Sequence, residues 1–151
     1  MAANLTAYGP TGGVSFHIGA TAQGNIPIRA WPTLPFGSEL WDTDNNFASN
    51  TFTAPVTGRY QLQCVLYFNS WDASCNYVQI RFNTSNRQYY VSIYDGDLFP
   101  NDATYCEYSS VSLVDMDASD TATTELFQAG GGAQMDMSDS TGCQFSGFLI
   151  G

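Results

Sequence analysis

The sequence predicts an all-β protein, an antiparallel sandwich or barrel, from three observations. First, apolar and polar side chains alternate strictly from Arg59 to Phe68, which is the period of a strand with one face in a core. Second, short strand-like runs recur along the chain, separated by turns rich in Gly, Pro, Asn and Asp. Third, no window shows a helical period. Regular short strands with such turns favour a sandwich or a barrel.

The length and composition indicate one folded domain. A chain of 151 residues is long enough to bury a core without disulfides or metals. The content of 44% hydrophobic and 15% aromatic residues excludes a disordered chain.

The charge balance limits the kinds of partner that the protein can bind. The net charge is −10, lysine is absent, and the four basic residues are Arg29, Arg59, Arg81 and Arg87. We therefore expect no nucleic-acid and no anionic-membrane partner, because both require a positive surface. No apolar run is long enough for a membrane span, and the first residues have no charged start or apolar stretch, so no secretory leader is expected. Collagen-like and heptad repeats are also absent from the sequence.

The expected elements follow in chain order. An extended arm is expected over 1–13 and one domain over 14–151. Within the domain we expect a first strand at 14–20, a Pro- and Gly-containing loop at 24–38, an Asx-rich turn at 42–46, strands at 59–69, 76–82, 88–94, 105–116 and 121–128, a Gly-rich segment at 129–142, and a last strand at 144–150.

Two runs give the chain a family resemblance. The run Phe52-x-x-Pro55-Val56-x-Gly58-x-Tyr60-x-Leu62 resembles the F-x-x-P-V-x-G-x-Y-x-F signature of the complement C1q globular-head family, relatives of tumour necrosis factor. The closing run F-S-G-F-L-I at 145–150 is similar to the F-S-G-F-L-L that ends those domains. The resemblance extends over about residues 14–151.

This resemblance implies a ten-stranded antiparallel jelly-roll sandwich that forms a homotrimer. It implies that both termini lie at the base and that the turns near 70–74, 95–104 and 129–142 meet at the opposite end. The residues expected to build the signature core and the trimer interface are Phe52, Pro55, Gly58, Tyr60, Leu62, Phe145, Gly147 and Phe148.

Acidic side chains on one of these turns are candidate ligands for a calcium ion. Asp95, Asp97 and Asp102 offer the hard oxygen ligands that calcium needs, although the spacing is not that of an EF-hand. The alternative is a solvated turn held by bonds from Asp side chains to their own backbone. No other cofactor is expected.

The four cysteines fit no zinc motif, because none of them form close pairs. Cys64 falls on the core face of the signature strand and is expected to be a buried free thiol. Cys75, Cys106 and Cys143 begin strands at the same predicted end, so one disulfide among them is a candidate, with free thiols as the alternative for a protein that folds in a cytosol.

Catalysis has little support in the sequence. His17 is the only histidine, and it lies in an alternating strand where a structural role is expected. Paired carboxylates occur on turns rather than in a recognisable cleft, so we expect no catalytic residues and no enzyme. Some of the abundant Tyr and Trp side chains are expected at a subunit interface, with sugar stacking as the alternative.

These points lead to a functional expectation. The chain is expected to be a structural or binding protein of a virus particle, a trimeric decoration (cement) protein on a bacteriophage capsid, since C1q-like sandwiches occur in phage proteins. The arm over 1–13 would then reach neighbouring capsid subunits. The alternative is an extracellular receptor- or glycan-binding head, such as a fibre tip or a secreted lectin-type protein.

Overall fold

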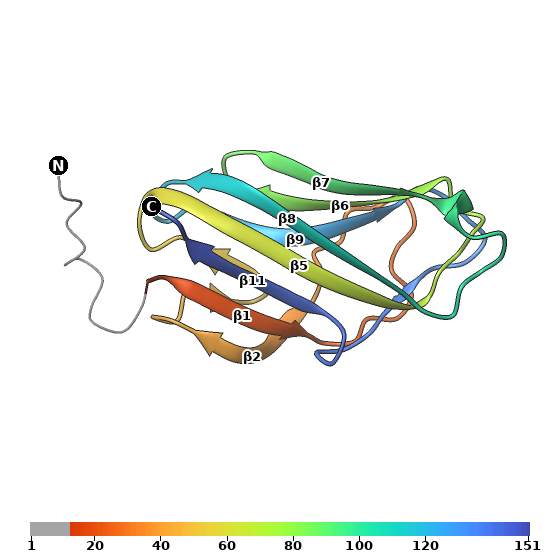
Figure 1. Cartoon of the computed structure of the whole chain (residues 1–151), viewed down its shortest axis with the longest axis horizontal. Coiled ribbons are helices and arrows are strands. Elements are labelled where there is room, and N and C mark those ends of the chain that lie inside the picture. Colours follow the sequence, from red (N-terminus) through yellow and green to blue (C-terminus); the bar gives the residue numbers. More distant parts are fainter. Residues whose placement is uncertain (1–12) are drawn as a thin grey trace.

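Two antiparallel β-sheets lie face to face in the structure, a computed structural model that describes residues 13–151 (Figure 1). The arm predicted over 1–13 therefore lies, except for Gly13, outside the described residues. Within residues 13–151 the only helical element is one 3-10 turn, η2 (Gly96–Leu98), and no helix is long and apolar enough to cross a membrane. The all-β prediction is confirmed.

The two sheets differ in the order of their strands. Sheet A runs in the order β2 (Phe36–Asp42), β1 (Ser15–Ala20), β11 (Gln144–Leu149), β5 (Gly58–Ser70) and β8 (Cys106–Met116), and β10 (Asp136–Met137) pairs with the far end of β5. Sheet B runs in the order β3 (Phe47–Ala48), β4 (Thr51–Thr53), β9 (Thr121–Gln128), β6 (Tyr77–Thr84) and β7 (Gln88–Asp95). This is a jelly roll, with eleven strands in the described part of the chain in place of the ten expected.

The signature strand β5 organises sheet A. It has 13 residues and pairs with β8 on one side and with β11 and β10 on the other. Its inward side chains are all fully buried: Tyr60, Leu62, Cys64, Leu66 and Phe68. The alternation predicted from the sequence is therefore the alternation observed.

The space between the sheets is filled by aromatic rings. The ring of Phe145 on β11 lies 5.0 Å from that of Phe16 on β1, and 5.7 Å from that of Phe82 on β6 in the other sheet. Ring pairs at such distances contribute about 0.5–1.5 kcal/mol beyond the area they bury. The core thus ties β1 and β11 of sheet A to sheet B.

Strand β2 was expected to be loop and turn. Its residues 37–41 are all exposed, and it is the edge of sheet A with irregular register against β1. An edge strand with five successive exposed residues carries no alternation, which is the signal that identifies strands in a sequence. The short strands β3, β4 and β10 were missed for a related reason, since two or three residues are too few to establish a period.

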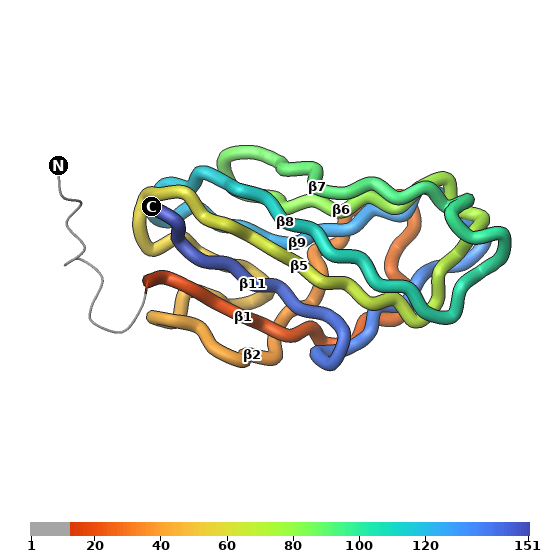
Figure 2. Tube along the Cα trace, viewed as in Figure 1, coloured from red at the N-terminus to blue at the C-terminus, as the bar shows by residue number. Residues whose placement is uncertain are grey.

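The loops sort to two ends, as the jelly-roll order implies. The start of β1 and the C-terminus lie at one end, and the connections β5–β6, β7–β8 and β9–β10 lie at the other (Figure 2). Backbone hydrogen bonds join Trp71 to Ala103, and the Ala73 amide donates to the Asp102 carboxylate at 2.9 Å. We call residues 71–76, 96–105 and 129–135 the apical loops.

Candidate functional site

The outward face of sheet A has an uncharged centre. Antiparallel neighbours that stand opposite one another point to the same side of a sheet, so the register defines rows of side chains across it. Three successive rows are Leu113–Gln61–Phe148–Ser15, then Val111–Gln63–Ser146–His17–Trp41, then Ser109–Val65–Gln144–Gly19. No residue of these rows carries a carboxylate, a guanidinium or an amine. We call this surface the sheet A face.

Apolar side chains on the sheet A face are freely accessible. Leu113 is 62% exposed and Val111 57%, both on β8, while Trp41 at the opposite edge is 50% exposed. Phe148 on β11 is 45% exposed between them. On β5 and β8, charged residues border the face at its ends, where Arg59 stands opposite Asp115 and Glu107 stands opposite Tyr67. A charge-depleted apolar centre with polar edges is typical of the core of a protein interface.

A hollow of 470 Å³ lies within the sheet A face, between β2 and β5. Its wall includes His17, Trp41 and Phe148, with Gln63 and Gln144 beside them. The His17 ring lies edge-on against the Trp41 ring, with 4.6 Å between the ring centres. His17 was expected to be structural, and the structure places it on the surface side of β1 in this hollow.

The outward face of sheet B differs, because it carries an ion pair. The Arg81 guanidinium on β6 donates to Glu125 on β9 at 2.7 Å, and both residues are less than a tenth exposed. The Trp31 ring covers the guanidinium at 3.9 Å and stacks on Phe127, 5.0 Å away. Asn83 donates to the second oxygen of Glu125 at 2.8 Å. Trp31 lies in the loop expected over 24–38, and its position over an ion pair was not predicted.

A buried carboxylate holds the apical loops together. Asp72 accepts hydrogen bonds from the Ser74 amide at 2.8 Å and the Ala133 amide at 2.9 Å. Burial acts to raise the pKa of Asp72, but the hydrogen bonds from Ser74, Ala133 and Gly132 outweigh it, so the pKa lies below its ordinary value. This carboxylate therefore works as a fixed anion that fastens the Gly-rich segment.

The proposed calcium ligands are engaged separately. Asp95 accepts from the Asp97 amide at 3.0 Å and caps η2, while Asp102 accepts from the Ala73 amide. Within residues 13–151 no three His, Cys, Asp or Glu side chains are grouped so as to hold a metal ion. The hydrogen bonds fit the alternative expectation of a turn held by its own Asp side chains. The calcium site therefore remains a prediction. The described residues of a single chain do not bring its proposed ligands together.

All four cysteines are unpaired. The expected free, buried thiol at Cys64 is present, and burial raises its pKa to about 12. The disulfide considered among Cys75, Cys106 and Cys143 is not formed. Cys143 instead bonds to the backbone of Tyr67, accepting from its amide at 3.0 Å and donating to its carbonyl at 3.3 Å.

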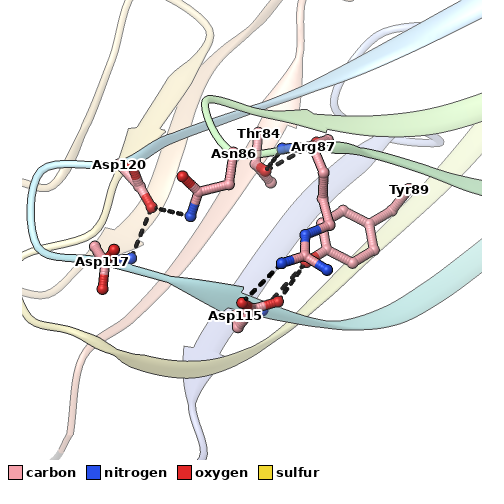
Figure 3. A network of polar contacts seen from close by, with 7 residues as sticks. All are labelled: Thr84, Asn86, Arg87, Tyr89, Asp115, Asp117 and Asp120. Carbon is pink, nitrogen blue, oxygen red and sulfur yellow. Dashed lines mark hydrogen bonds and ion pairs between the residues drawn. The ribbon is translucent and has the colours of Figure 1, made fainter.

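A polar network closes the base end (Figure 3). Its members are Thr84, Asn86, Arg87, Tyr89, Asp115, Asp117 and Asp120. Tyr89 donates to Asp115 at 2.8 Å, and Arg87 forms an exposed ion pair with the same carboxylate at 3.2 Å. Asp120 accepts from the Asp117 amide at 2.7 Å and from Asn86. These bonds connect the β6–β7 turn to the β8–β9 turn. The network therefore has a structural role.

The eight signature residues divide between the core, the turn at the base end and the sheet A face. Phe52, Tyr60, Leu62, Phe145 and Gly147 are buried inside the chain and build its core. Gly58 and Pro55 belong to the base end, where Gly58 lies against Leu149. Of the eight, only Phe148 lies on the sheet A face, within its charge-free rows. The exposed apolar positions Val111 and Leu113 were not among the predicted site residues, whereas Trp41 is one of the Tyr and Trp side chains considered for a subunit interface.

Known structures share the fold of this chain. The globular domain of zebrafish complement 1qA protein superposes with a TM-score of 0.68, at 19% sequence identity, covering 93% of this chain and 98% of that one. Murine APRIL, of the TNF family, superposes with a TM-score of 0.61 at 10% identity, covering 91% of this chain and 98% of that one. The chain has the C1q/TNF-like fold. No protein-family model and no curated protein matches the sequence.

The C1q/TNF-like fold places the two candidate surfaces in distinct positions on the molecule. The sheet A face presents accessible apolar side chains around a hollow, which suits association with a protein surface. The apical loops present carboxylates that are engaged by backbone amides. Of the two, the sheet A face is the stronger candidate for a functional site.

Proposed function

We propose that the chain is a non-enzymatic binding and structural protein that works as a homotrimer assembled through the sheet A face. The observation that carries the proposal is the set of charge-free rows with Val111, Leu113 and Trp41 exposed on them. Accessible apolar area of this kind favours burial by about 25 cal/mol per Å². A head-to-tail contact forms a closed ring where the rotation between copies closes, and a closed ring of three copies is the state that the C1q/TNF-like resemblance implies.

For the setting of this trimer we propose the surface of a bacteriophage capsid, as a decoration protein. The acidic, lysine-free composition disfavours nucleic acid and anionic membranes, which leaves protein surfaces as partners. The receptor- or glycan-binding head is the alternative, because the apical loops would be presented away from the base in either setting.

The assembly is tested by placing a charge on the sheet A face. Leu113→Asp is expected to convert the trimer to a monomer, because burying an unpaired carboxylate in an interface is costly. The matched control is Ile93→Asp, since Ile93 is also 62% exposed but belongs to β7 of sheet B. Light scattering on the purified proteins measures the mass. A wild-type monomer, or equal dissociation in both variants, would contradict the proposal.

The setting is tested by counting copies in purified virus particles by quantitative mass spectrometry. A decoration protein is present in hundreds of copies, whereas a fibre head is present in a handful. Binding on a glycan array with few or no copies on the capsid would favour the alternative.

A further inference from the structure

We draw no further inference here: the strongest candidate, the aromatic surface that Trp31, Tyr90 and Phe127 form on the outward face of sheet B, carries no proposal because nothing among residues 13–151 shows what would cover it.

Discussion

Gly96 lies so close to the backbone of Cys75 that no side chain fits there. A Cβ atom at this position would overlap the carbonyl oxygen of Cys75. Gly96→Ala is therefore expected to destabilise the fold by about 3 kcal/mol, the upper range of overpacking. Urea denaturation measures the change. Gly37→Ala is the control, because its new methyl would meet nothing nearer than the Thr21 hydroxyl at 3.9 Å, and equal losses in the two variants would contradict the steric argument.

Tyr60 combines a buried ring with a hydrogen-bonded hydroxyl group. Its ring lies edge-on to Phe52 at 5.5 Å, and its hydroxyl donates to the Val56 carbonyl at 2.7 Å. Tyr60→Ala is expected to lower the free energy of unfolding by about 3–5 kcal/mol, and Tyr60→Phe by about 1 kcal/mol, because the second change removes the hydroxyl group and keeps the buried ring. Equilibrium denaturation separates the two. A loss below about 1 kcal/mol in Tyr60→Ala would mean that the strand does not bury this ring.

At the scale of elements, a buried ion pair joins β6 to β9. Arg81→Met is expected to cost about 3–5 kcal/mol, because Glu125 would be left as an uncompensated buried charge. The double change Arg81→Met with Glu125→Leu is expected to recover most of this loss. Arg87→Met provides the matched control, since its pair with Asp115 is exposed and worth less than about 1 kcal/mol. Thermal denaturation of the four proteins checks the order, and a double variant no better than Arg81→Met would refute it.

The apical loops should respond to acid through Asp72. Its pKa is lower in the folded chain than the ordinary aspartate value of about 3.9, so its contribution to stability is complete above that value and is lost as the pH falls through the lower folded-state pKa. Hydrogen exchange of the Ala133 amide, which donates to this carboxylate, is expected to accelerate in that range after correction for intrinsic rates. Asp72→Asn should exchange faster at neutral pH with a weaker acid response. Equal protection of the wild-type Ala133 amide at all pH values would contradict the proposed dependence of the apical loops on the Asp72 carboxylate.

Strand β8 shows where alternation misleads. Taken alone, Ser110-Val111-Ser112-Leu113 suggests that the two apolar residues face the core. The pairing with β5 places Ser110 opposite buried Cys64 and Val111 opposite exposed Gln63, so the apolar phase faces outward. Register, which comes from the partner strand, decides the face.

For the whole molecule, burial should protect the thiols until the chain unfolds. Burial raises the pKa of Cys75, Cys106 and Cys143 to about 11, and that of Cys64 to about 12, so little reactive thiolate is present near neutral pH. Iodoacetamide without reductant is expected to modify none of them in the folded protein over short exposure and all four in denaturant, as measured by intact mass. Two unmodified thiols in denaturant would reveal a disulfide.

Much of the fold was predictable and most of the candidate site was not. Three segments can be recognised from neighbouring residues alone, and the structure places them as expected: the alternating strand from Tyr60 to Phe68, the signature from Phe52 to Leu62, and the strand at 121–128. Trp41, Leu113 and His17 come from three strands far apart in the chain, and only sheet pairing brings them onto one surface. Trp31 over Arg81 likewise depends on a loop folding across sheet B.

The sequence by itself determined the class of the fold, its strongest strands and the sparsity of positive charge, because periodicity and composition are properties of neighbouring residues. The tertiary structure decided which face of β8 meets solvent, where the edge strand β2 lies, and that the centre of one sheet carries no charge. Those features depend on which residues stand opposite one another across hydrogen-bonded strands, and that relation is set by the packing of the whole chain.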